Sequence, residues 1–262
     1  MTQATVLILG GTTEARELAG RLATRPGLRV VTCLAGRTRE PAPLAGEVRT
    51  GGFGGARGLA QWLDVHRAAA VIDASHPFAQ AISTNTAAAC AESGTPLLSL
   101  GRRPHTAGPG DDWHDVSSLQ AAAELLPSLG RRAFLTTGRE GLAVFAALHQ
   151  MWFLIRCASP PPGPLPAARQ VILARGPYRA DREHPLMKQQ RIDVLVTKNS
   201  GGAQTAGKLT AARHLGLPVI MISRTASEVP DYLSPAAAER WLLGVVAERL
   251  YPGSSGRMKV RW

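Results

Sequence analysis

The sequence predicts an α/β protein with two doubly wound parallel sheets, and three observations lead to this prediction. Short apolar runs such as TVLIL (5–9) and AAVIDA (69–74) alternate along the chain with Ala-rich or amphipathic stretches. Continuous apolar runs are typical of strands that crossover helices bury on both faces. The chain has 262 residues, which suits two ordinary α/β domains. No run of 18 apolar residues occurs, so no membrane-spanning helix is expected.

The first domain is expected to occupy residues 1–101. Its strands are predicted at 5–9, 28–35, 69–74 and 97–100, and its helices at 13–25, 58–66 and 78–92. The loop-rich stretch GRRPHTAGPGDDWHD (101–115) follows, and we interpret residues 102–115 as a linker because Pro and Gly interrupt both periodicities.

The second domain is expected to occupy residues 116–250. Its strands are predicted at 132–137, 152–158, 170–174, 192–197 and 218–222, and its helices at 118–129, 141–150, 179–190, 205–216 and 235–250. The tail 251–262 is polar and has no periodicity, which is typical of a disordered or vector-derived segment.

The charge and cysteine content limit the possible partners. Thirty Lys and Arg residues against nineteen Asp and Glu residues give a net charge of +11, which favours an anionic partner. The cations are mostly single arginines with few aromatic residues among them, so a phosphorylated cofactor with a polycarboxylate fits as well as nucleic acid does. A solvated Arg-rich surface is the simpler alternative. Cys33, Cys90 and Cys157 lie far apart, so we expect buried thiols in a cytoplasmic protein without a metal site.

The turn after the first strand resembles a phosphate-binding turn. In LILGGTTEARELA (7–19), Gly10 and Ala15 fill the first and third positions of G-x-G-x-x-G/A, but Thr12 replaces the second glycine. The turn also opens a helix, whose free N–H groups and positive dipole favour an anion. A plain helix N-cap is the alternative. We expect a cofactor pyrophosphate to contact Gly10, Gly11, Thr12, Thr13 and Glu14.

The end of the second strand distinguishes the two nicotinamide cofactors. The stretch LAGRTRE places Arg37 and Arg39 where an NAD site would carry an acid, so NADPH is favoured over NADH. We expect Thr38, between them, to take part, although both arginines also suit a solvated loop. The glycine-rich stretch RTGGFGGARGL (49–59) follows, and its Gly51 and Gly52 can lie against the cofactor or form a flexible turn.

The stretch VIDASHPF (71–78) ends another strand with Asp73, Ser75 and His76. Open α/β sheets bind ligands at carboxyl ends of strands. Since no G-x-S-x-G elbow is present, we assign these residues to a pocket and not to a hydrolase. Ser75 is expected to contact the cofactor. His76 is the candidate for both substrate contact and proton donation.

The stretch VTKNSGGAQTAGKL (196–209) resembles a phosphate loop with one change. Gly202, Gly207 and Lys208 fit G-x-x-x-x-G-K-[ST], but Leu209 stands where a Mg²⁺-binding hydroxyl belongs. Lys208 is expected inside the following helix, which argues against an ATPase. An anion nest at residues 198–202 is the preferred interpretation, and a helix cap is the alternative.

Several of these stretches together resemble the precorrin-6A reductase family. They are LILGGTTEARELA, VIDASHPFA, LTTGREGL, ARGPY with Glu183 downstream, and IDVLVTKNSGG followed by KLTAAR and LGLPVIMI. The resemblance spans about residues 5–225. It implies two Rossmann-like domains with an active-site cleft between them. It also implies reduction of precorrin-6A to precorrin-6B by NADPH, at the C18–C19 double bond, in cobalamin biosynthesis.

The implied substrate carries several carboxylates, which suits an Arg-rich chain because the guanidinium fork binds carboxylates bidentately. We expect the substrate to contact His76, Thr137, Gly138, Arg139, Arg175, Lys198, Asn199, Ser200, Gly201 and Gly202. A monomer without nucleic-acid or membrane partners is favoured. Two alternatives stay open, namely another NADP-linked reductase and a non-catalytic nucleotide or nucleic-acid binder.

Overall fold

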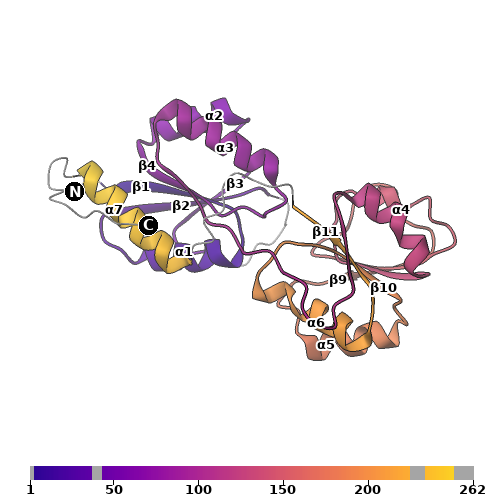
Figure 1. The fold of residues 1–262 in the computed structure, drawn as a ribbon. Coiled ribbons are helices and arrows are strands. Elements are labelled where there is room, and N and C mark those ends of the chain that lie inside the picture. Colours follow the sequence, from indigo (N-terminus) through magenta and orange to yellow (C-terminus); the bar gives the residue numbers. More distant parts are fainter. Residues whose placement is uncertain (1–2, 37–42, 225–233, 251–262) are drawn as a thin grey trace. The chain divides into compact units, whose positions relative to one another are not determined.

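The computed structural model describes residues 3–36, 43–224 and 234–250 of a chain that divides into two compact units (Figure 1). The first unit combines Met1–Gly101 with Glu228–Trp262, and the second is Arg102–Ser227. Within the described ranges, no helix has both the length and the apolar character needed to cross a membrane.

The first unit contains a five-stranded sheet in which all pairings are parallel. Its order is β3-β2-β1-β4-β5, with strands β1 (Ala4–Leu9), β2 (Leu28–Leu34), β3 (Glu47–Thr50), β4 (Ala68–Asp73) and β5 (Leu97–Ser99). Strands β2 and β3 extend the sheet on one side of β1, and strands β4 and β5 extend it on the other side. The sheet therefore has its topological switch point between β1 and β4, where doubly wound proteins bind ligands.

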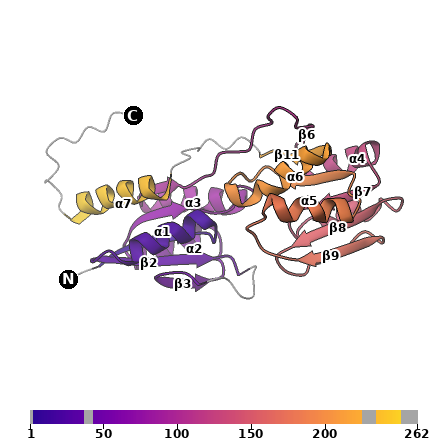
Figure 2. The same ribbon diagram turned by 90° about the horizontal axis from the view of Figure 1, so that it is seen from below.

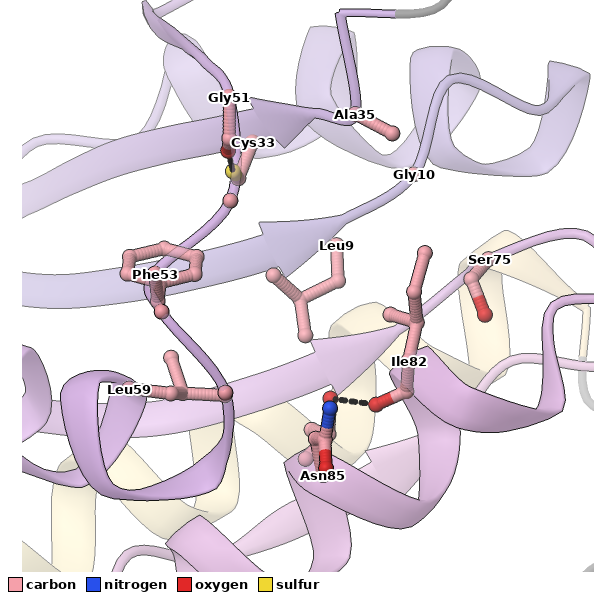
Figure 3. A pocket seen from close by; sticks show the side chains of 14 residues that line it. Leu9, Gly10, Cys33, Ala35, Gly51, Phe53, Leu59, Ser75, Ile82 and Asn85 are labelled. Atoms are coloured by element: carbon pink, nitrogen blue, oxygen red, sulfur yellow. Dashed lines mark hydrogen bonds between the residues drawn. The ribbon is translucent and has the colours of Figure 1, made fainter.

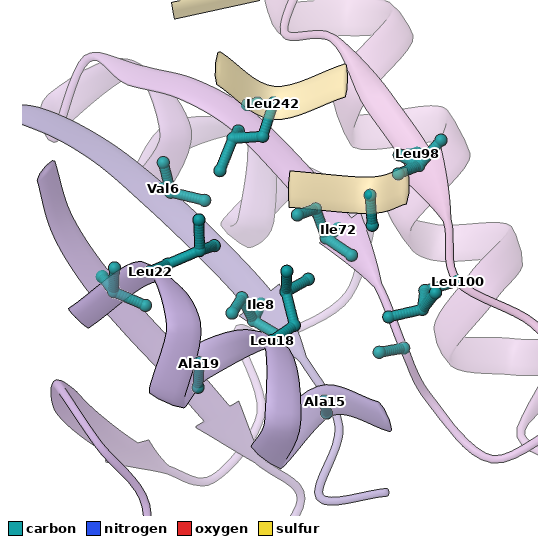
Figure 4. Packing of buried hydrophobic residues seen from close by; sticks show 14 of the residues in the cluster. Val6, Ile8, Ala15, Leu18, Ala19, Leu22, Ile72, Leu98, Leu100 and Leu242 are labelled. Carbon is teal, nitrogen blue, oxygen red and sulfur yellow. The ribbon is translucent and has the colours of Figure 1, made fainter. Parts of the chain in front are cut away.

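Helices cover both faces of this sheet (Figures 1 and 2). One face carries α1 (Thr13–Ala23) and α7 (Pro235–Leu250), and the other carries α2 (Ala56–Val65) and α3 (Gln80–Ser93). Figure 4 shows the first face as a continuous apolar layer. In this layer the sheet side chains pack between the two helices, and the members drawn include Val6, Ile8, Ile72, Leu18, Leu22 and Leu242.

The placement of α7 differs from the expected domain division. The sequence prediction assigned residues 235–250 to the second domain, but Ala238, Leu242 and Val246 are buried in the core of the first unit. Glu239 adds a polar contact, since it accepts hydrogen bonds from Arg21 at 2.8 Å and Arg25 at 2.7 Å. The chain therefore returns to its first sheet, because α1 alone leaves part of that face uncovered.

The second unit contains a six-stranded parallel sheet of order β6-β11-β10-β7-β8-β9. Its strands are β6 (Trp113–Val116), β7 (Arg132–Leu135), β8 (Trp152–Cys157), β9 (Arg169–Leu173), β10 (Val194–Lys198) and β11 (Val219–Ile222). One face carries α5 (Ala180–Gln189) and α6 (Gly207–Leu215), and α4 (Leu119–Leu129) lies on the other (Figure 1). Two short 3₁₀ turns, η1 (Leu142–Phe145) and η2 (Ala203–Thr205), complete the unit.

The two units share one strand order. The order β9-β8-β7-β10-β11 repeats β3-β2-β1-β4-β5, and β6 is added beside β11. The second sheet therefore has its own switch point, between β7 and β10. This arrangement confirms the predicted fold class of two doubly wound parallel sheets.

Three local predictions differ from the structure. The exposed strand β3 was not expected, because its sequence EVRT is polar and it pairs only with β2 at the sheet edge. Strand β6 begins inside the expected linker and ends one residue beyond it, and residues 102–115 belong to the second unit. The helix expected at 141–150 is only the single turn η1, because packing between adjacent strands overrides the helix propensity of an Ala-rich stretch.

Candidate functional site

A pocket of about 180 Å³ lies at the carboxyl ends of the first unit's strands (Figure 3). Leu9 forms its floor, Phe53 and Leu59 lie on one side, and Ser75 and Ile82 lie on the other. The remaining lining residues are Gly10, Cys33, Ala35, Gly51, Gly52, Gly54, Gly55, Asn85 and Thr86. The pocket thus opens beside the switch point, and its lining is mostly apolar.

The turn between β1 and α1 brings two strand ends together. Gly10 has φ +115°, and a Cβ there would lie 2.4 Å from the carbonyl oxygen of Ala74. Only glycine therefore permits this approach of β1 to β4. Thr12 caps α1, since its Oγ1 accepts a hydrogen bond from the Ala15 N–H at 3.2 Å and donates to the Ala74 carbonyl at 3.0 Å. Its hydroxyl thus has structural partners, and the positive end of the helix dipole favours an anion at this turn.

The other predicted residues of the first switch point follow β4. Ser75 lines the pocket, its N–H donates to Asp73 Oδ1 at 3.0 Å, and its hydroxyl lies 3.3 Å from that of Ser83. His76 is exposed, and its Nδ1 accepts a hydrogen bond from the Phe78 N–H at 3.2 Å. This bond places the proton of a neutral His76 ring on Nε2.

The glycines after β3 leave space for a flat ligand. Gly51, Gly54 and Gly55 have φ of +108°, +83° and +91°, and a Cβ on any of them would meet no atom within 4 Å. Their backbone can therefore lie against a ligand in the pocket, which fits the expected role of Gly51 and Gly52. Arg37, Thr38 and Arg39 lie outside the described residues.

The second switch point brings together predicted residues from β7 and β10. Thr137 is buried, and its hydroxyl has no hydrogen-bond partner among the described residues. Gly138 has φ +88° and open space around it. Arg139 donates to Glu140 at 3.1 Å and lies 3.5 Å from the Ser159 hydroxyl. A buried hydroxyl without a partner costs free energy, which a polar ligand group would recover.

The loop after β10 mainly contacts the chain itself. A Cβ on Gly201 would lie 2.1 Å from the Arg103 carbonyl oxygen, and one on Gly202 would lie 3.0 Å from the Arg102 side chain. The Asn199 amide donates to the His105 carbonyl at 2.9 Å and accepts from the His105 N–H at 2.8 Å. The expected assignment of these three residues to substrate therefore has a competing explanation, namely that they dock segment 102–105.

Arg224 extends this contact. It donates to the Asn199 carbonyl at 2.9 Å and to the Arg102 carbonyl at 2.8 Å. The segment thus places Arg102 and Arg103 beside the β10 loop, although the sequence prediction treated both as linker residues. Two adjacent arginines shortly after β5 were the only sequence signal for this contact with the β10 loop.

A buried charged cluster lies under α5 and α6, where the sequence prediction placed no functional group. Arg156 of β8 donates to both carboxylate oxygens of Glu183, at 2.6 and 2.8 Å. Its guanidinium also lies 3.7 Å from the Tyr178 ring centroid. Lys208 of α6 is 5% exposed, and burial together with the Arg156 cation lowers its pKa to about 7. The predicted position of Lys208 inside a helix is confirmed.

The structure thus groups most predicted residues at the two switch points. Gly10 through Glu14, Gly51, Gly52, Ser75 and His76 gather in the first unit, and Thr137 through Arg139 and Lys198 through Gly202 gather in the second. Arg175 is exposed and follows β9, two strands from β7. All three cysteines are buried and free, as expected. The described ranges contain no group of three His, Cys, Asp or Glu side chains positioned for a metal ion.

The fold and these sites define a class of α/β proteins with a ligand site at the switch point of each of two doubly wound sheets. Within that class, the chain belongs to the precorrin-6x reductase family. The family model described as Precorrin-6x reductase CbiJ/CobK matches residues 5–243. The resemblance inferred from the sequence is thereby confirmed.

Individual relatives agree with this assignment. A Precorrin-6A reductase of Rhodococcus erythropolis is 51% identical over 89% of this chain and 96% of its own length. A Cobalt-precorrin-6A reductase of Salmonella typhimurium is 32% identical over 86% of this chain and 89% of its own length. A solved structure of CobK precorrin-6A reductase superposes with a TM-score of 0.86 at 41% identity, covering 93% of this chain and 97% of the other.

Proposed function

We propose that this protein reduces precorrin-6A to precorrin-6B with NADPH, by hydride transfer to the C18–C19 double bond of the macrocycle. One observation carries the proposal. A relative named Precorrin-6A reductase shares 51% of its residues with this chain across 96% of its own length. We assign the cofactor to the switch point of the first unit and the substrate to that of the second.

The first unit is the cofactor side of this proposal. The positive dipole end of α1 attracts a pyrophosphate to the turn at Gly10 and Gly11, and the pocket takes the apolar parts of the dinucleotide. The residues present fit this group, because the glycines after β3 leave open space beside the pocket. Arg37 and Arg39 are proposed to favour NADPH over NADH, with Thr38 between them. When bound, the cofactor supplies the hydride.

The second unit is the substrate side. Thr137 and Arg139 offer a hydroxyl without a partner and a half-buried guanidinium at the end of β7. Lys198 at the end of β10 and Arg175 after β9 add positive charge at the same edge of the sheet. We infer that these groups bind carboxylates of the macrocycle. Asn199, Gly201 and Gly202 then act indirectly, by holding segment 102–105 in place.

His76 is the proposed contact between protein and substrate on the first unit. Because its Nδ1 accepts from the Phe78 N–H, a neutral His76 carries its proton on Nε2, and Nε2–H is the group proposed to donate to a substrate carboxylate. The same group can deliver the proton that completes the reduction. We propose the binding role as the main one.

We further propose that the natural substrate is the cobalt-free macrocycle. Identity is 51% to a relative named Precorrin-6A reductase and 32% to one named Cobalt-precorrin-6A reductase. Parallel assays with both macrocycles test this choice, and faster turnover of the cobalt complex would contradict it.

The main test is anaerobic incubation of the full chain with precorrin-6A and NADPH. Loss of NADPH absorbance together with a spectral change of the macrocycle supports the proposal. A control with NADH should proceed more slowly. Oxidation of NADPH without a change in the macrocycle would overturn the substrate assignment.

A further inference from the structure

A row of four residues crosses the first sheet at the base of the pocket. Asp73 of β4 pairs with Leu9 of β1, Leu9 pairs with Cys33 of β2, and Cys33 pairs with Arg49 of β3. Registered residues of parallel strands project to the same face. Leu9 and Cys33 pack on the α2/α3 face, so Arg49 projects to that face too, where it contacts the pocket residues Gly52 and Phe53.

The Arg49 side chain is fixed by residues that line the pocket. Its guanidinium carbon lies 4.7 Å from the centroid of the Phe53 ring, and its Nη2 donates to the Gly52 carbonyl at 3.4 Å. Its charge also acts on the Cys33 thiol, partly opposing the rise in the thiol's pKa that burial causes. Arg49 therefore lies beside the pocket, and stacking on Phe53 limits the orientations of its fork.

Arg49 has no acidic partner among the described residues. The neighbouring Arg29 is different, because it donates to both carboxylate oxygens of Glu47, at 2.7 and 2.8 Å. The two arginines lie on the neighbouring strands β2 and β3. Arg29, however, lies near the start of β2, away from the pocket. An exposed guanidinium without a carboxylate, held against an aromatic ring, is well prepared to bind a phosphate.

We propose that Arg49 binds the 2′-phosphate of the cofactor's adenosine. This inference rests on the proposed function, since it presupposes a dinucleotide in the pocket. Phe53 and Leu59 offer apolar surface to the purine ring, and the open glycines admit it. Arg49 is two strands from Leu9, about 10 Å at the usual strand spacing, so a ligand with its pyrophosphate at Gly10 extends along the strand ends toward it.

The test uses two small ligands that differ only in the 2′-phosphate. Calorimetric titration of the full chain compares adenosine 2′,5′-bisphosphate with adenosine 5′-monophosphate. The wild-type protein is expected to bind the bisphosphate more tightly. Arg49→Ala should weaken bisphosphate binding about 10- to 100-fold, the effect of losing a charged hydrogen bond, and leave monophosphate binding nearly unchanged.

Two further variants separate the fork from the charge. Arg49→Lys keeps the charge but loses the planar fork. Its affinity for the bisphosphate should therefore lie between those of wild type and Arg49→Ala. Arg29→Ala is the matched control, because it removes an arginine from the same sheet away from the pocket, and it should bind both ligands like wild type.

The outcomes distinguish this inference from the proposed function. If NADPH still binds better than NADH and Arg49→Ala keeps the full preference for the bisphosphate, Arg49 is not the phosphate contact and the inference is overturned. If the wild-type protein binds neither the bisphosphate nor NADPH, the cofactor assignment itself is wrong and the inference fails with it.

Discussion

Replacing Lys208 by Met is expected to make the protein more stable near neutral pH. Lys208 is almost fully buried in α6. The nearby Glu183 carboxylate is already paired with Arg156, so its charge is balanced without Lys208. Burial is the largest cause of its lowered pKa, and the Arg156 cation adds to it. Methionine has a similar length and no charge, and it leaves the Arg156–Glu183 pair intact.

The size of the effect follows from the pKa. A fall from 10.5 in an unfolded chain to about 7 in the folded protein corresponds to at most about 5 kcal/mol, at roughly 1.4 kcal/mol per pH unit. Between these two values the unfolded chain binds more protons than the folded one, so wild-type stability rises with pH across this window. Lys208→Met removes this contribution, so its advantage should be largest at about pH 6 and should shrink toward about pH 10.

Urea unfolding at about pH 6, 8 and 10 measures this difference. Lys188→Met is the matched control, because Lys188 lies on the neighbouring helix α5 but is exposed. The control should leave stability within about 0.5 kcal/mol of wild type at every pH. A Lys208→Met protein that is less stable than wild type at about pH 6, or an advantage that does not change with pH, would refute the reasoning.

Three other predictions concern Lys198, His76 and Glu239. Lys198→Ala should weaken macrocycle binding and leave NADPH affinity nearly unchanged in titrations; an equal loss of both affinities would show that Lys198 serves the cofactor. His76→Ala should slow turnover by no more than the roughly 10²–10⁴-fold typical of a lost general acid, mostly through substrate affinity. A larger loss in kcat at unchanged KM would make His76 an obligatory acid. Arg21 and then Arg25 hold the pKa of Glu239 below 4.5, so this contact stabilises the protein above about pH 4.5 and is lost as pH falls further. Melting temperatures of wild type and Glu239→Gln should therefore converge on acidification, and parallel curves would contradict the role of this contact.

The predictable part of the fold is the part with strong periodicity. The buried strands β1, β4 and β10 are continuous apolar runs, and their order along the chain was sufficient for the fold class. The place of α7 was not predictable, because an apolar helix after the last strand fits either sheet. Strand β3 escaped prediction because an exposed edge strand needs no apolar pattern.

The candidate site was predictable where strand ends carry glycines and hydroxyl groups. The turn at Gly10 and the loop at Lys198 both lie at switch points, as their positions after buried strands indicate. What could not be predicted depends on contacts distant in sequence. Gly201 faces the Arg103 carbonyl, which lies almost a hundred residues earlier, so a contact within the chain competes with the expected role of this glycine in substrate binding. The pairing of Arg156 with Glu183 could not be predicted either, because the two residues lie 27 positions apart in the sequence.

The most direct test of the proposed function follows the hydride itself. Precorrin-6A is incubated anaerobically with the full chain and NADPH deuterated at C4, each epimer in a separate reaction, and the mass of the macrocycle is measured. The proposal predicts that the reduced product carries one deuterium from one epimer and none from the other. A reduced product without deuterium from either epimer, or no reduced product, would contradict it.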